Sequence, residues 1–208
     1  MLCFLLIGCG ILLTMPSSAE SQGSSSLKLG EDAGQPLIME GDDPVLRYNF
    51  RSIDPPPGFL QKVSESNRKY ARSRSNYIHP LYGPGGTCLT KDWSFDPPHH
   101  RGIYWAWPEV EHGGEPGDLH ALQKVFARPS GEVRSERDGD WLQIEAENLW
   151  HWEDEEPVVR ELVVIRVHAE GPEGRFVDLE FHFRALVDSL TLARRGTDKY
   201  GGLNVRLS

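Results

Sequence analysis

Two histidines and an arginine stand side by side at the start of an aromatic segment, where residues 95–107 read FDPPHHRGIYWAW. Histidine both gives and takes a proton near neutral pH, and the arginine guanidinium offers a fixed fork of donors to a carboxylate, a phosphate or an oxyanion. Such groups are unfavourable to bury without a purpose. We therefore predict a polar site whose catalytic residues are His79, His99, His100 and Arg101.

A second group of residues around this motif is suited to substrate binding. Aromatic side chains with a polar group match the apolar face of a sugar ring, although packing in the core or on a sheet is the alternative role for them. The turn GTDKYGG at 196–202 carries an acidic and a basic residue between glycines, and a plain hairpin turn is its alternative. The predicted substrate-binding residues are Tyr82, Trp93, Tyr104, Trp105, Trp107, Asp198 and Lys199.

The same histidines allow a metal site as an alternative. His79 with His99 or His100, together with Asp92 or Asp96, would supply the two-histidine carboxylate set that binds Fe, Mn or Zn. No tight spacing such as H-x-H or H-E-x-x-H supports this set. We therefore expect no cofactor, and a divalent metal ion is the alternative.

The elements that must position these residues are β-strands. The segment VDLEFHFRA at 177–185 alternates apolar and polar residues, which predicts a strand with one buried and one solvated face. Pro97 and Pro98 keep the paired histidines on a loop before the next strand. The sequence predicts an all-β fold, an antiparallel β-sandwich. Its further strands are expected at 44–50, 77–82, 87–90, 102–107, 121–127, 141–149, 158–168, 188–193 and 203–207.

The first residues of the chain predict export. An uncharged apolar run over 2–15 is too short to span a bilayer comfortably and is followed by small residues, so residues 1–19 are predicted to be a signal peptide cleaved near Ala19. A lipoprotein acylated at Cys9 is the alternative, because LIGC at 6–9 is similar to a lipobox. We expect a secreted or periplasmic protein with a disordered leader at 20–36 and a single β-sandwich domain at 37–208.

Composition excludes several partners. Asp and Glu number 31 against 22 Lys and Arg, which gives a net charge of −9 and no basic face for nucleic acid. No segment after the signal reaches transmembrane length, so we expect no stable membrane insertion. The single cysteine of the mature chain, Cys88, excludes an internal disulfide. The sequence does not indicate the oligomeric state.

Two long motifs resemble those of a known family. The run YIHPLYGPGGTCLTKDWSFDPPHHRGIYWAW at 77–107 and DKYGGLNVR at 198–206 are similar to the secreted bacterial family automatically labelled "methane oxygenase PmoA". The resemblance implies an all-β protein similar to the galactose-mutarotase-like supersandwich and associated with carbohydrate catabolism. It places a histidine-rich motif on His79, His99, His100 and Arg101, and a D-x-K-like motif on Asp198 and Lys199. Members of this family continue past GGLNVR, so we expect the chain to be the N-terminal part of a longer sandwich.

These observations predict an exported carbohydrate-processing or carbohydrate-binding protein with a carbohydrate or sugar-acid ligand. His99 or His100 would act as general acid or base and Arg101 would bind a substrate oxygen, in an isomerase, lyase or hydrolase reaction. Methane oxidation is not expected, because a membrane-bound methane monooxygenase subunit needs several transmembrane helices. The alternatives are a non-catalytic sugar-binding module, with Tyr104, Trp105 and Trp107 stacking on the ligand, and a metal-dependent enzyme that uses the histidines.

Overall fold

A computed structural model describes residues 27–196 and 200–208 of the chain. The predicted signal peptide at 1–19, the alternative lipidation site Cys9, and the predicted binding residues Asp198 and Lys199 lie outside the described residues. Antiparallel strands dominate the fold, so the prediction of an all-β sandwich is confirmed. Among the described residues, no helix is long and apolar enough to cross a membrane.

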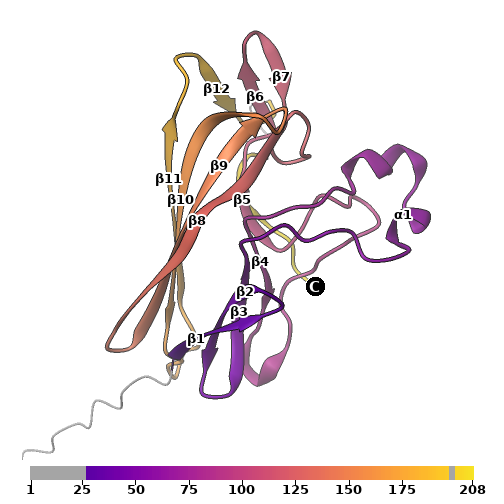
Figure 1. The fold of residues 1–208 in the computed structure, drawn as a ribbon. Helices are drawn as coiled ribbons and strands as arrows, with labels where there is room; N and C mark the ends of the chain where they lie inside the picture. The colour runs from indigo at the N-terminus through magenta and orange to yellow at the C-terminus, as the bar shows by residue number, and fades with distance from the viewer. Residues whose placement is uncertain (1–26, 197–199) are drawn as a thin grey trace, which may run out of the picture.

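Two sheets face each other and a smaller sheet covers one end (Figure 1). The first sheet has the order β1 (Leu27–Asp32), β2 (Gln35–Glu40), β3 (Asp43–Asn49), β4 (Tyr77–Leu81), β5 (Ile103–Ala106) and β13 (Gly202–Val205). The second has the order β11 (Val177–Ala185), β10 (Glu156–His168), β9 (Trp141–Trp152) and β8 (Val125–Asp138). The small sheet contains β12 (Leu190–Ala193), β6 (Glu109–His112) and β7 (Glu115–Gly117).

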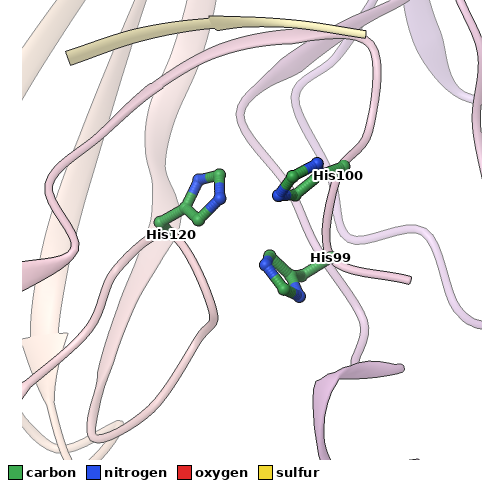
Figure 2. A group of neighbouring side chains, drawn as sticks. All are labelled: His99, His100 and His120. Carbon is green, nitrogen blue, oxygen red and sulfur yellow. The ribbon is translucent and has the colours of Figure 1, made fainter. Parts of the chain in front are cut away.

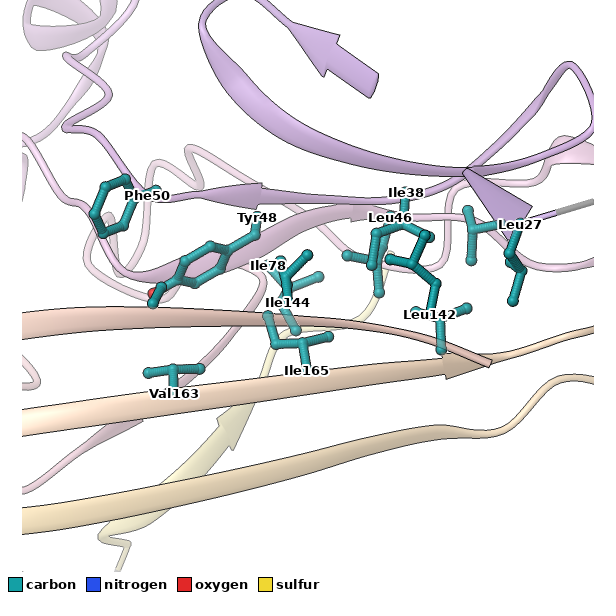
Figure 3. Close-up of a cluster of buried hydrophobic side chains, with 13 residues drawn as sticks. Leu27, Ile38, Leu46, Tyr48, Phe50, Ile78, Leu142, Ile144, Val163 and Ile165 are labelled. Carbon is teal, nitrogen blue, oxygen red and sulfur yellow. The ribbon is translucent and has the colours of Figure 1, made fainter. Parts of the chain in front are cut away.

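The apolar side chains of the alternating segments fill the space between the two large sheets. Leu142 and Ile144 of β9 and Ile165 of β10 are almost fully buried against Ile38 and Leu46 of the first sheet (Figure 3). The strands predicted at 141–149, 158–168 and 177–185 are all present, and β10 pairs with β9 on one side and β11 on the other. Burial of these alternating apolar side chains is the main stabilising contribution to the sandwich.

The structure corrects three predictions about the elements. The expected disordered leader is wrong over residues 27–36, because β1 pairs with β2 in a hairpin that Leu27 and Ile38, both fully buried, fix to the core. Residues 87–90 form only isolated bridges, and the strand expected at 121–127 begins at Val125. The strands β6 and β7 were not predicted, because Gly and Pro interrupt the pattern there.

An excursion between β3 and β4 extends from the first sheet. It contains the short helices α1 (Phe59–Lys62) and η1 (Glu65–Tyr70) and projects from the sandwich in Figure 1. Phe59 packs against two aromatic residues of the loop at 91–101, with ring centroids 5.1 Å from Trp93 and 5.3 Å from Phe95. A short η2 helix (Pro84–Gly86) follows β4. The excursion thereby supports the loop that carries the paired histidines.

Gly102 joins that loop to β5. Its φ is +53°, and a Cβ atom at this position would lie 2.0 Å from the carbonyl oxygen of Ile78 on β4. Its amide donates to Lys91 O at 2.9 Å, and its carbonyl accepts from Arg206 N at 2.8 Å. Only glycine fits this close approach. Gly102 therefore fixes the point at which the loop that carries the two histidines enters β5.

Candidate functional site

Three imidazoles converge beside β5. His99 and His100 come from the loop before the strand, and His120 comes from the loop at 118–124 that follows β7. Their ring centroids lie 4.6 Å (His99 to His100), 4.9 Å (His99 to His120) and 4.8 Å (His100 to His120) apart. One potential ligand nitrogen of each ring lies within 4.8 Å of the others, and Figure 2 shows the rings facing a common centre. We call these three residues the histidine cluster.

His120 was not predicted, although it is the most buried member of the cluster, with 2% of its surface exposed. Its loop is closed by a pair of hydrogen bonds between the main chains of Asp118 and Gln123, each 2.8 Å long. The buried guanidinium of Arg74 donates to the carbonyl oxygens of Leu119, at 3.1 Å, and His120, at 2.5 Å. In the sequence His120 stands alone between an acidic turn and a short apolar run. No local spacing signal links it to the paired histidines.

Tyr104 orients His120. The hydroxyl of this buried tyrosine lies 2.7 Å from His120 Nδ1 and 3.4 Å from the carbonyl oxygen of His99. Because a carbonyl oxygen can only accept, we assign the Tyr104 hydroxyl as the donor to His99 O. The Tyr104 oxygen then accepts a second hydrogen bond from a proton on His120 Nδ1. The lone pair is then on His120 Nε2, a buried atom without a hydrogen-bond partner, as is His99 Nδ1. Two buried nitrogens of the cluster are therefore unsatisfied.

The cluster is held neutral. Burial, with a smaller effect from the charge of Arg74, lowers the pKa of His120 to about 2. Burial is also the main cause that lowers the pKa of His99 to about 3, with smaller effects from His100 and Arg74. For His100, burial and then the charge of Arg206 lower the pKa. Neutral imidazoles with free lone pairs are the protonation state in which histidine binds metal ions.

Arg101 does not join this cluster. Its guanidinium, 1% exposed, donates from Nε and Nη2 to the two carboxylate oxygens of Asp92 and from Nη2 to the Tyr77 hydroxyl. It also lies over the ring of Trp93, 3.5 Å from the ring centroid, and over the ring of Tyr77 at 4.6 Å. Burial acts to raise the pKa of Asp92, but the hydrogen bond and charge of Arg101 outweigh it and the pKa is lowered. These residues form a buried ion pair enclosed by aromatic rings.

His79 lies apart from the cluster as well. Its Nδ1 is 3.0 Å from the hydroxyl of Thr90, and burial lowers its pKa. Because Asp92 is engaged with Arg101 and Asp96 accepts a hydrogen bond from Asn67, the structure does not assemble the predicted two-histidine carboxylate set. His120 supplies the third ligand-type side chain instead.

The predicted aromatic residues lie at several different places. Trp93 stacks under Arg101, whereas Trp105 packs against the rings of β11, 5.2 Å from Phe181 and 5.8 Å from Phe183. Trp107 packs on the buried core beneath the small sheet. Tyr82 lines a cleft of about 660 Å³ between β3, η2 and the turn before β11, away from the histidines. Of the predicted binding aromatics, only Tyr104 contacts the cluster directly.

Comparisons with known proteins place the chain in one family. A family model described as "Family of unknown function (DUF6807)" matches residues 36–208, which is most of the chain. No curated protein and no solved structure shows significant similarity to the sequence. The chemistry of the site must therefore be inferred from its own residues.

Proposed function

The chain belongs to the DUF6807 family, whose function is unknown, and from the site we propose that it is an exported enzyme that depends on a divalent transition metal. The ion is held by His99, His100 and His120. Three protein ligands are the number found in catalytic zinc sites, where the remaining position is open to water or substrate. An ion held in this way polarises a substrate oxygen as a Lewis acid.

The observation that supports this proposal most strongly is the unsatisfied Nε2 of His120 at the centre of the cluster. A buried polar atom without a partner is unfavourable by about 1–3 kcal/mol, and the imidazole lone pairs offer nothing to each other. A cation that accepts all three lone pairs satisfies them together. Tyr104 then has the role that a carboxylate or carbonyl has in other metal sites, since its hydroxyl oxygen accepts a hydrogen bond from His120 Nδ1 and fixes the orientation of the ring.

The spacing of the ligands fits an ion of the zinc class after a small closure. Tetrahedral ligation at about 2.0–2.1 Å brings the ligand nitrogens to about 3.3 Å from one another. The nitrogens of the cluster lie within 4.8 Å of one another. His99 and His100 are on a loop and partly exposed, so modest rotations of their side chains close this difference around the buried His120.

The acid–base mechanism expected from the sequence receives less support from the geometry. A general acid or base works best when its pKa lies near the working pH, and the pKa values of His99 and His120 lie near 3 and 2. Arg101, expected to bind substrate, is enclosed with Asp92. Carbohydrate remains the proposed substrate class, on the basis of the resemblance of the histidine motif and the predicted export.

Metal binding can be measured directly. We expect purified protein, stripped with chelator and dialysed against Zn²⁺ or Co²⁺, to retain one ion per chain by elemental analysis. His120→Ala should lose this ion, because it removes the buried ligand. The bound Co²⁺ should also give the absorption spectrum of a low-coordinate site.

His79→Ala is the matched control, because His79 is a partly buried histidine near the same loop that hydrogen-bonds Thr90 and not the cluster. It should keep full metal stoichiometry. Retention of the ion by His120→Ala, or the absence of any retained ion in the unmodified protein, would contradict the proposal.

A further inference from the structure

Two arginines beside the histidine cluster have no carboxylate partner among the described residues. The hydrogen bonds of the buried Arg74 end on the carbonyl oxygens of Leu119 and His120, and its Nε has no partner. Arg206 is partly buried, its Nε also has no partner, and its Nη2 makes only a long 3.4 Å contact to the hydroxyl of Ser94. Within residues 27–196 and 200–208, no carboxylate balances the charge of either guanidinium group.

A shortage of acidic residues does not explain these unpaired charges, because the chain has 31 acidic and 22 basic residues. The other two arginines near the site are paired in the usual way, Arg101 with Asp92 and Arg195 with Asp118. A buried charge without a counterion is unfavourable by several kcal/mol. An anionic ligand would supply the counterion that Arg74 and Arg206 do not find in the described part of the chain.

The main chain places Arg206 next to His100. Its amide donates to the carbonyl of Gly102, and its own carbonyl accepts from Lys91 N at 3.0 Å, so it lies between the two ends of the loop that carries the histidines. The yellow C-terminal segment runs over the cluster on the side of His100 in Figure 2. After burial, the charge of Arg206 has the largest effect on the pKa of His100.

We infer that the metal site takes an anionic ligand of the carboxylate class, such as a sugar acid, and that Arg206 binds its carboxylate. This inference rests on the proposed metal-dependent function and names the substrate class of the same site. The parallel N–H donors of the Arg206 guanidinium match the two oxygens of a planar carboxylate. The open position of the metal would take a neighbouring oxygen of the ligand. Arg74 adds a fixed positive charge on the opposite side, at His120. A neutral sugar would leave both guanidinium groups unpaired.

The test compares acidic and neutral ligands on the Zn²⁺-loaded protein. Glucuronate should raise the unfolding temperature in a concentration-dependent way, whereas glucose should not, because only the acid pairs with Arg206. Arg206→Gln should bind glucuronate at least about tenfold more weakly, which is the effect expected for loss of a charged hydrogen bond. Its zinc affinity, measured by competition with a chromophoric chelator, should stay close to that of the unmodified protein and shows that the variant is folded.

Lys91→Gln is the matched control. It removes one positive charge from an exposed neighbour of Arg206 and should bind glucuronate as the unmodified protein does. Equal shifts with glucose and glucuronate, or tight glucuronate binding by Arg206→Gln, would overturn the inference, and stronger binding of inorganic phosphate than of glucuronate would overturn its carboxylate assignment. If zinc binds without any effect of glucuronate, the inference alone fails. If no zinc binds, the proposed function fails with it.

Discussion

His100 and Arg101 are neighbours in the chain and belong to two clusters of opposite kind. Arg101 lies in a charge-paired cluster, where Asp92, Tyr77 and Trp93 surround its guanidinium, although its Nη1 has no hydrogen-bond partner. His100 lies in an unsaturated cluster of neutral rings, in which two buried nitrogens have no partner. The charge of the first cluster is balanced by Asp92. In the second, no described residue forms a hydrogen bond with Nε2 of His120 or Nδ1 of His99.

The difference shows how to separate structural from functional polar residues in this molecule. Burial alone does not do so, because Arg101 and His120 are both almost fully buried. The pairing of charges and lone pairs does, because the charge of Arg101 is paired with Asp92 although its Nη1 has no partner, whereas Nε2 of His120 keeps a free lone pair. A buried polar group with its partners in place stabilises the fold, whereas one that keeps a free lone pair is prepared for a ligand. Three predictions test this distinction.

The largest effect is expected at the ion pair of Arg101 with Asp92. Arg101→Met leaves the carboxylate of Asp92 partly buried without its cation, and we expect the free energy of unfolding to fall by about 3–5 kcal/mol. His100→Ala, one residue away, should lower it by less than about 1 kcal/mol and should abolish tight metal binding. Denaturant titration of both variants checks the pair. Equal destabilisation by the two substitutions would remove the distinction between the clusters.

An intermediate effect is expected at Glu161, which is fully buried and only half satisfied. Its Oε2 accepts from Asn76 Nδ2 at 2.7 Å and from Trp150 Nε1 at 2.6 Å, while Oε1 has no partner. Burial raises its pKa from 4.5 to about 7, and the hydrogen bonds from Trp150 and Asn76 and then the charge of Arg74 only partly oppose this shift. The nearby Tyr48 hydroxyl is un-ionised. The folded protein therefore keeps a proton here that the unfolded chain has lost.

The sign of the pH dependence follows from this difference. The stabilisation by Glu161 is fully present below its unfolded pKa and is lost as the pH rises through about 7. We expect the free energy of unfolding of the unmodified protein, relative to Glu161→Gln, to fall by about 3 kcal/mol between about pH 4.5 and about pH 8. Subtracting the variant removes the contribution of the histidines. A difference that does not change with pH would show that Glu161 ionises normally.

The smallest effect is expected from the hydroxyl that orients His120. Tyr104→Phe removes the acceptor of the Nδ1 proton, so zinc affinity should fall about 10–100-fold while the free energy of unfolding falls by only about 1 kcal/mol. Tyr70→Phe is the control, because Tyr70 packs on His99 with ring centroids 5.0 Å apart. It should leave zinc affinity unchanged. Equal losses in the two variants would show that ring packing, not the hydrogen bond, orients the cluster.

Much of the fold could be predicted, because it depends on local pattern. The alternation at 177–185 directly indicates a strand with one buried face. The hairpin of β1 and β2 was missed because Gly30 and the acidic end of LKLGED hide the strand pattern, and only the contact of Leu27 with the core fixes it. The formation of this hairpin therefore depends on packing against residues that are distant in the sequence.

The site divides in the same way. The unusual chemistry of HHR in one loop indicated His99 and His100, which the structure brings together. Their separation from Arg101 depends on the close approach of Gly102 to the carbonyl oxygen of Ile78. The position of His120 depends on Arg74, which holds the loop at 118–124. Neither contact leaves a spacing signal in the sequence. His120 was therefore recognised as a member of the cluster only from the structure.

The distribution of the site along the chain has a consequence for folding. The three histidines lie within residues 99–120, whereas Arg206 is 112 residues from Ser94, with which it makes contact across the loop. Closing a short loop loses less conformational entropy than closing a long one, and distant pairings form more slowly. A metal ion present during refolding would thus meet its ligands before β13 pairs with β5. Under the proposed function, the ion would bind first and the selectivity for carboxylates would form last.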